Sequence, residues 1–147
     1  LGDTGMVAQF PCRPASQQRR VDLAGVPTTM TLNVCEASGI TFAVSHADVS
    51  DPARVGPALR FLRDTGHANL GAAPSSGATS PWRVPGMTPQ SEAGQWQIVG
   101  RLPDGRVLTS VMGLSSRGTV VVQASASAAS LQDAARQSFF EGIRFQP

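Results

Sequence analysis

Lysine and tyrosine are absent from this sequence, and charged residues make up only 15% of it. The 12 basic residues are all arginines and face 10 acidic residues, which leaves a formal net charge of +2. A Walker-type phosphate loop is excluded, because that loop needs a lysine. The arginines are spread along the chain, and only Arg19 and Arg20 are adjacent. Because nucleic-acid-binding proteins usually gather positive charge on one face, we expect no nucleic-acid partner.

Long hydrophobic runs are missing as well. No stretch approaches the roughly 18 apolar residues of a membrane-spanning helix, so we expect no transmembrane segment within this sequence. The chain begins with Leu1 instead of methionine, which fits the removal of a secretion signal or lipid anchor and fits a chosen expression boundary equally well.

Cysteine is scarce, with Cys12 and Cys35 as the only two. They do not form a C-x-x-C motif, so thioredoxin-type redox chemistry is not expected. A disulfide between them would stabilise the fold by about 3 kcal/mol, mainly through the unfolded state. Two buried free thiols are the alternative. Since disulfides persist in oxidising compartments, the pair favours an extracytoplasmic location, in the periplasm or at a membrane surface.

The first third of the chain predicts strands joined by tight turns. Alternation of apolar and polar residues favours strands at residues 6–10, 17–23, 28–36 and 40–48. The turn between the second and third of these is expected at Gly25, which would bring Cys12 and Cys35 to one end of the sheet. Consecutive strands with short turns form an antiparallel meander.

The pattern then changes to that of a helix. Asp51 is a typical N-cap and Pro52 a typical first helical residue. Val55, Leu59 and Leu62 form an apolar stripe at helical spacing. The helix is predicted to end at Gly66, or at Gly71 if it continues.

Strands return in the second half of the chain. Asp104-Gly105 predicts a hairpin between residues 95–102 and 106–113. A second turn is expected at residues 115–118. The continuous apolar run Val120–Val122 is typical of a central strand covered on both faces. A short helix from Leu131 that stops at Gly142 and a last strand at residues 143–145 complete the prediction.

Together these elements predict one α+β domain over residues 1–147, an antiparallel sheet of about six to seven strands with two helices. A loop rich in Pro, Gly and Ser at about residues 71–91 leaves room for one short edge strand, around Trp82–Val84. Loops of this length are often functional. Trp82, Arg83 and Met87 belong to types enriched at interfaces, and we expect them to contact a protein partner, with Trp96 if it is exposed. Alternatively, Trp82 packs on the core.

The arrangement resembles the Mog1/PsbP-like α/β sandwich of bacterial lipoproteins and extrinsic subunits. The resemblance is carried by the opening Phe10-Pro11, the hairpin Thr28–Glu36 and Ile40–Asp48, the helix from Asp51, the turn Asp104-Gly105, and the terminal Phe139-Phe140-x-x-Ile143-Arg144-Phe145. It implies a non-catalytic binding role, as an accessory subunit of a membrane complex, a chaperone or an adaptor. It supplies no active-site residue to carry over.

Two other functions remain open. His46, Asp48, Asp51 and His67 could converge on a metal ion, which would make the protein a small hydrolase or metal-dependent enzyme that uses His46 and His67. The spacing of these four residues matches no known metal-binding motif. Ser45, His46 and Asp48 also suggest a catalytic triad, but Ser45 and His46 are neighbours on a predicted strand and would point to opposite faces. A small-ligand carrier, with a pocket between the sheet and the first helix, is the third hypothesis. We expect no resident cofactor.

Overall fold

A computed structural model of the chain describes residues 4–71, 78–131 and 133–146. Its elements in chain order are β1 (Met6–Val7), β2 (Ala15–Leu23), β3 (Val26–Ala37), β4 (Ile40–Asp48), the 3-10 helix η2 (Pro52–Arg54), α1 (Val55–Asn69), β5 (Ala78–Ser80), β6 (Gly94–Arg101), β7 (Val107–Arg117), β8 (Val120–Ala128), α2 (Asp133–Glu141) and β9 (Arg144–Phe145).

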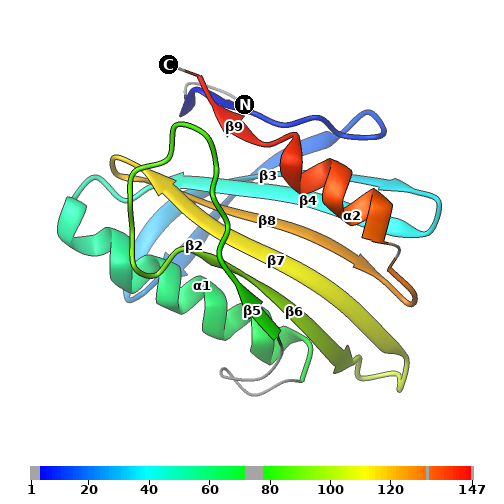
Figure 1. The fold of residues 1–147 in the computed structure, drawn as a ribbon. Helices are drawn as coiled ribbons and strands as arrows, with labels where there is room; N and C mark the ends of the chain where they lie inside the picture. Colours follow the sequence, from blue (N-terminus) through cyan, green and yellow to red (C-terminus); the bar gives the residue numbers. More distant parts are fainter. Residues whose placement is uncertain (1–3, 72–77, 132, 147) are drawn as a thin grey trace.

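Seven strands form one antiparallel sheet in the order β2-β3-β4-β8-β7-β6-β5. The α+β fold with a mainly antiparallel sheet and two helices therefore agrees with the prediction. β1 and β9 pair with each other in a separate two-stranded sheet, so the two ends of the chain meet at the top of Figure 1. In that view α1 lies below the large sheet, and α2 and β9 lie above it.

β8 occupies the centre of the sheet, as its run of valines predicts. Val121 is fully buried against the α1 side, and its neighbour Val122 is buried against the α2 side. Because adjacent strand residues point to opposite faces, a strand covered on both sides needs apolar residues at consecutive positions.

The α1 side of the sheet is covered by the apolar stripe of that helix. Val55, Leu59 and Leu62 pack on a core that includes Trp96 and Leu114. The carboxylate of Asp51 accepts a hydrogen bond from the backbone N–H of Ala53, at 2.9 Å, so the predicted cap is present, but it begins a 3-10 turn that leads into the α-helix. The helix passes Gly66, continues to Asn69 and is followed by Gly71, whose φ is +66°.

The opposite side of the sheet is covered by several segments together. α2, the β1–β9 sheet and the chain from Trp82 to Met87 contribute to this second core. Phe139 and Phe140 of α2 are both buried, and their rings meet at 5.5 Å with an interplanar angle of 81°. Phe139 also packs on Phe42 of β4, with ring centroids 4.9 Å apart. This side of the sheet therefore holds most of the aromatic residues.

Some elements differ from their predicted bounds. The edge strand expected at Trp82–Val84 is wrong: the strand is β5 (Ala78–Ser80), and residues 82–84 lie between Pro81 and Pro85 outside any strand. The turn expected at residues 115–118 begins later, because β7 continues through Arg117. The first strand is shorter than predicted and the last strand joins it instead of the main sheet. Residues 72–77 of the predicted loop lie outside the described residues.

Candidate functional site

Of the four residues expected to contact a partner, both tryptophans are buried. Trp82 and Trp96 each keep only 9% of their surface exposed. Trp82 belongs to the core on the α2 side of the sheet, with Phe139 and Phe140, which we call the α2-side core. Trp96 belongs to the core on the α1 side, with Leu59 and Leu114, which we call the α1-side core. The alternative that Trp82 packs on the core is therefore the one the structure shows, and the condition that Trp96 be exposed is not met.

Trp82 is positioned by a strand and a helix. Its ring meets Phe140 of α2 edge-on, with centroids 5.5 Å apart. It also lies against the bare backbone of Gly113 in β7: a Cβ atom added there would be 2.5 Å from Cε3 of the indole. Only glycine leaves room for an indole at this distance from the strand, so the position of Trp82 depends on Gly113.

Arg83 and Met87 differ in their surroundings. Arg83 is exposed, and it forms no hydrogen bond or ion pair with any residue that the structure describes. Met87 is partly buried: its backbone N–H donates to the Val84 carbonyl at 3.0 Å, and its Sδ accepts from the Val84 N–H at 3.3 Å. Met87 therefore shapes its own turn, whereas Arg83 is available to a partner.

The chain from Pro81 to Ala93, which carries Arg83 and Met87, is held firmly by its neighbours. The Thr88 N–H donates to the carbonyl of Ser116 in β7 at 2.8 Å, and the Phe145 N–H of β9 donates to the Pro85 carbonyl at 2.8 Å. Near its other end, Glu92 forms an ion pair with Arg60 of α1 at 3.1 Å. The backbone bonds at Pro85 and Thr88 flank Met87, and the pairing of Ser80 with Gln95 holds the chain before Arg83, so the surface around Arg83 and Met87 is preformed.

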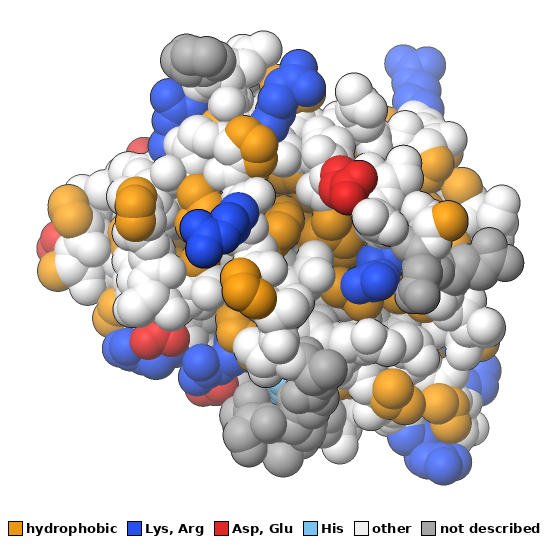
Figure 2. All heavy atoms as spheres, viewed as in Figure 1, with side chains coloured by type: hydrophobic (Ala, Val, Ile, Leu, Met, Phe, Trp, Pro, Cys, Tyr) orange, Lys and Arg blue, Asp and Glu red, His pale blue; other side chains and the backbone are white. Residues whose placement is uncertain are grey.

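A hollow of about 470 Å³ lies beside Trp82, and we call it the α2 groove. Its apolar lining comes from Trp82, Pro85, Phe140 and Ile143. Figure 2 shows hydrophobic side-chain atoms exposed in the middle of this view, with arginine and acidic side chains around them. A concave, largely preformed site with an apolar lining is typical of ligand and peptide binding sites.

Polar side chains complete the lining of the α2 groove. They are Arg83, Gln95 of β6, and Arg136, Gln137 and Glu141 of α2. The Gln137 amide donates to the Glu141 carboxylate at 3.0 Å. The Gln95 side chain has no hydrogen-bond partner in the described part of the chain. The site thus combines a hydrophobic surface with unused hydrogen-bonding capacity.

A second hollow, of about 340 Å³, lies beside the same segment. Trp82 and Arg83 line it as well, together with Met87, Pro89 and Gln90. Arg83 is therefore shared by the two hollows, and a ligand in either one would lie near its guanidinium group.

The two histidines lie on opposite sides of the sheet. His46 of β4 follows Ile40, Phe42 and Val44 on the α2 side, whereas His67 is fully buried on α1, which packs on the other side. The His67 Nδ1 lies 2.7 Å from the Arg63 carbonyl, to which it can donate. The sheet between the histidines prevents them from sharing one metal ion, so the structure does not support the predicted site.

The carboxylates of that predicted cluster have structural roles. Asp48 accepts hydrogen bonds from the Thr119 hydroxyl at 2.7 Å and from the Ser50 N–H at 2.9 Å, and these bonds lower the pKa of its carboxyl group. Asp51 caps the 3-10 turn. Across residues 4–71, 78–131 and 133–146, no group of three or more His, Cys, Asp and Glu is arranged to hold a metal ion.

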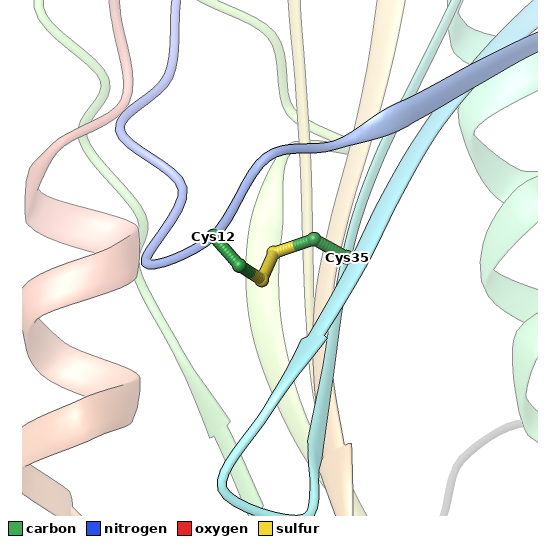
Figure 3. The surroundings of a disulfide bond; sticks show 2 residues. All are labelled: Cys12 and Cys35. Atoms are coloured by element: carbon green, nitrogen blue, oxygen red, sulfur yellow. A yellow bond between two sulfur atoms is a disulfide. The ribbon is translucent and has the colours of Figure 1, made fainter.

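The predicted disulfide is present. Cys12 and Cys35 are bonded, with their Cα atoms 5.9 Å apart (Figure 3). The bond ties the segment after β1 to β3, and both sulfurs pack against the α2-side core. Phe10 of the same segment packs on Phe139, with ring centroids 5.6 Å apart. The disulfide therefore anchors a segment that covers part of this core.

Between the sheet and the first helix, where the sequence predicted a small-ligand pocket, the described side chains pack closely. Leu59 is fully buried there, and Met112 of β7 reaches so close to Gly66 that a Cβ atom on that glycine would be 2.6 Å from its Sδ. The α2 groove is on the opposite side of the sheet.

Of the polar residues that line the α2 groove, the sequence identified Arg83 and missed Gln95, Arg136, Gln137 and Glu141. The adjacent pair Phe139-Phe140 was the sequence signal that α2 carries an aromatic surface.

Neither α-helix in the described part of the chain is long and apolar enough to cross a membrane. Comparison with protein-family models, curated proteins and solved structures finds no match for this chain. The resemblance to Mog1/PsbP-like domains therefore stays a prediction, and the function has to be inferred from the site.

Proposed function

We propose that the protein is a non-catalytic, extracytoplasmic binding module that docks on a protein partner through the α2 groove. The observation that carries this proposal is an exposed arginine, unpaired among the described residues, beside a hollow lined by both aromatic and polar side chains. Arg83 has no partner among the described residues, and Trp82 and Phe140 line the hollow next to it. Arginines beside aromatic surfaces are typical of the residues that dominate binding energy in protein interfaces.

The extracytoplasmic part of the proposal is supported by the disulfide between Cys12 and Cys35. Disulfides of this kind persist where the environment is oxidising. The finer proposal, that the partner belongs to a membrane complex of which this chain is an accessory subunit, follows from the resemblance to Mog1/PsbP-like domains. A domain of that type would be bacterial and would carry its function on its surface.

The non-catalytic part rests on how the candidate catalytic groups are used. His46 and His67 are on opposite sides of the sheet, and Asp48 and Asp51 are engaged in turns and caps. Groups that act together on a substrate must lie within hydrogen-bonding reach of its reacting atoms. These four residues do not meet that condition.

The test compares two variants with the same change of charge. Arg83→Glu alters the α2 groove, and Arg19→Glu alters β2, which is at the opposite edge of the sheet from β5. Both arginines are exposed, so each variant should keep its stability within about 0.5 kcal/mol. After mild crosslinking in cells that produce the protein, membrane and soluble fractions are captured separately for the wild type and both variants.

We expect a protein partner that is recovered in fixed proportion with the wild type and with Arg19→Glu, and lost with Arg83→Glu. Recovery from the membrane fraction would support the accessory-subunit role. Equal recovery with all three proteins would contradict the α2 groove as the docking site. Recovery of this chain alone from both fractions would contradict a protein partner.

A further inference from the structure

We infer that the α2 groove takes an extended peptide segment of the partner in which a carboxylate side chain lies next to a large apolar side chain. This inference rests on the proposed function and names the chemistry that the groove recognises. It follows from three properties of the lining: its apolar residues, its balance of charge and its side-chain amide groups.

The apolar surface fits one large side chain of a partner. Trp82 and Phe140 are in edge-to-face contact and have little freedom to move, because Gly113 and the α2-side core hold them. The two rings keep 9% and 5% of their surface exposed, so the hollow of about 470 Å³ offers a partner side chain a small but rigid aromatic contact, without a cost in ordering the protein. Leucine, isoleucine and phenylalanine are the residues that gain most from such burial.

The charges of the lining favour an acidic group. Arg83 and Arg136 are two positive side chains, against the single carboxylate of Glu141. That carboxylate already accepts a hydrogen bond from Gln137. The guanidinium group of Arg83 donates to no residue that the structure describes. Its planar shape matches a carboxylate in a two-pronged hydrogen-bonded pair.

The amide groups favour a peptide over a simple anion or a lipid. The side-chain amide of Gln95 in β6 has no partner among residues 4–71, 78–131 and 133–146, and Gln137 of α2 lines the groove from another element. An amide side chain both donates and accepts, which is what the main chain of an extended peptide requires from its binding site. The phosphate group of a lipid, like a simple anion, only accepts hydrogen bonds, so it would leave the Gln95 side-chain carbonyl without a donor.

The probe is a library of random heptapeptides displayed on phage and selected against the wild-type protein. We expect enrichment of Asp or Glu adjacent to Leu, Ile or Phe. The most enriched peptide is then synthesised together with a copy in which the acidic residue is replaced by its amide. Both peptides are titrated against the wild type, Arg83→Gln and the matched control Arg19→Gln.

Arg83→Gln should weaken binding of the acidic peptide by about 10- to 100-fold, while the amide peptide should bind wild type and Arg83→Gln equally. Arg19→Gln should bind both peptides as the wild type does. The two tryptophans give an internal control, because the indole N–H signal of Trp82 should shift on titration and that of Trp96, on the other side of the sheet, should not.

Enrichment of basic or purely apolar peptides would overturn the inference, and so would equal losses for the two peptides. Vesicles of phosphatidylglycerol that bind with the same dependence on Arg83, in the absence of enriched peptides, would overturn it in favour of a lipid. The proposed function fails separately, when crosslinked capture of a partner does not depend on Arg83. A partner captured through Arg83 without any acidic peptide being enriched would leave that function intact and refute this inference.

Discussion

Gly113 and Trp82 are 31 positions apart in the sequence and form one contact on which the α2 groove depends: a Cβ atom at Gly113 would lie 2.5 Å from Cε3 and 2.7 Å from Cζ3 of the indole, and 3.0 Å from Cε1 of Phe140. The strand is bare at the point where the two rings rest on it. Because interiors are closely packed, one methyl group is enough to displace them.

Gly113→Ala should therefore destabilise the protein by about 1–3 kcal/mol, since the added methyl group forces the rings of Trp82 and Phe140 to move. Urea unfolding followed by circular dichroism measures the loss. The control is Gly56→Ala on α1, where the nearest atom to the new Cβ would be 4.0 Å away. There we expect a gain of up to about 1 kcal/mol from helix propensity, so losses of equal size in both variants would show that the close contact is not the cause.

Trp82→Ala should cost about 3–5 kcal/mol, because it empties a buried position next to Phe140. Of the two roles that the sequence left open for Trp82, contact with a partner and packing on the core, this prediction follows from the second. The free energy of unfolding is compared with that of Arg83→Glu, which should be close to the wild-type value. Wild-type stability in Trp82→Ala would contradict the burial of this side chain.

Removing the disulfide should destabilise the chain by about 3 kcal/mol, since the unfolded state regains the freedom of the loop between Cys12 and Cys35. The measurement is the urea midpoint of the double variant Cys12→Ser/Cys35→Ser, with and without a reductant. Reductant should lower the midpoint of the wild type and leave that of the variant unchanged. A wild-type midpoint insensitive to reduction, with loss of the disulfide verified by mass, would count against this prediction.

Stability should fall between neutral and mildly acidic pH because of His46. Burial lowers the pKa of His46 below its ordinary value of 6.5, so the unfolded chain takes up a proton at a higher pH than the folded chain does. The free energy of unfolding therefore decreases as the pH falls through 6.5 towards the folded-state pKa, and this contribution levels off below it. His46→Gln should remove that decrease.

The check is the urea midpoint of wild type and His46→Gln from about pH 8 to 5. The carboxyl group of Asp48, whose pKa is lowered by hydrogen bonds from Thr119 and Ser50, contributes at more acidic pH and is present in both proteins. The urea midpoint of the wild type should fall below that of His46→Gln, relative to their values at pH 8, as the pH passes through the range around 6.5. Parallel curves would mean that His46 titrates alike in the folded and unfolded chain.

Much of the fold could be predicted because its signals are local. The turn at Gly25 fixed the pairing of β2 with β3, and consecutive Val121 and Val122 indicated a strand covered on both faces. Asp51 and Pro52 marked the start of the helical region, although the chain first makes a 3-10 turn there. In each case neighbouring residues carry the pattern.

The site could be predicted only in part, because it is built by contacts between distant segments. Whether Trp82 is exposed depends on Gly113 and Phe140, and neither is close to it in the sequence. The pairing of β1 with β9 and the way α2 faces β6 are equally non-local. Arg83 could be singled out by residue type, but the companions that make it a site could not.

The docking role of the α2 groove is tested most directly by photocrosslinking at single positions in living cells that produce the protein. A photoreactive phenylalanine derivative replaces Gln137 in the groove or, as control, Arg19 on β2. We predict one discrete crosslinked protein from position 137 and none from position 19. Absence of any adduct at position 137, or the same adduct from both positions, would contradict the assignment of this groove as the binding surface.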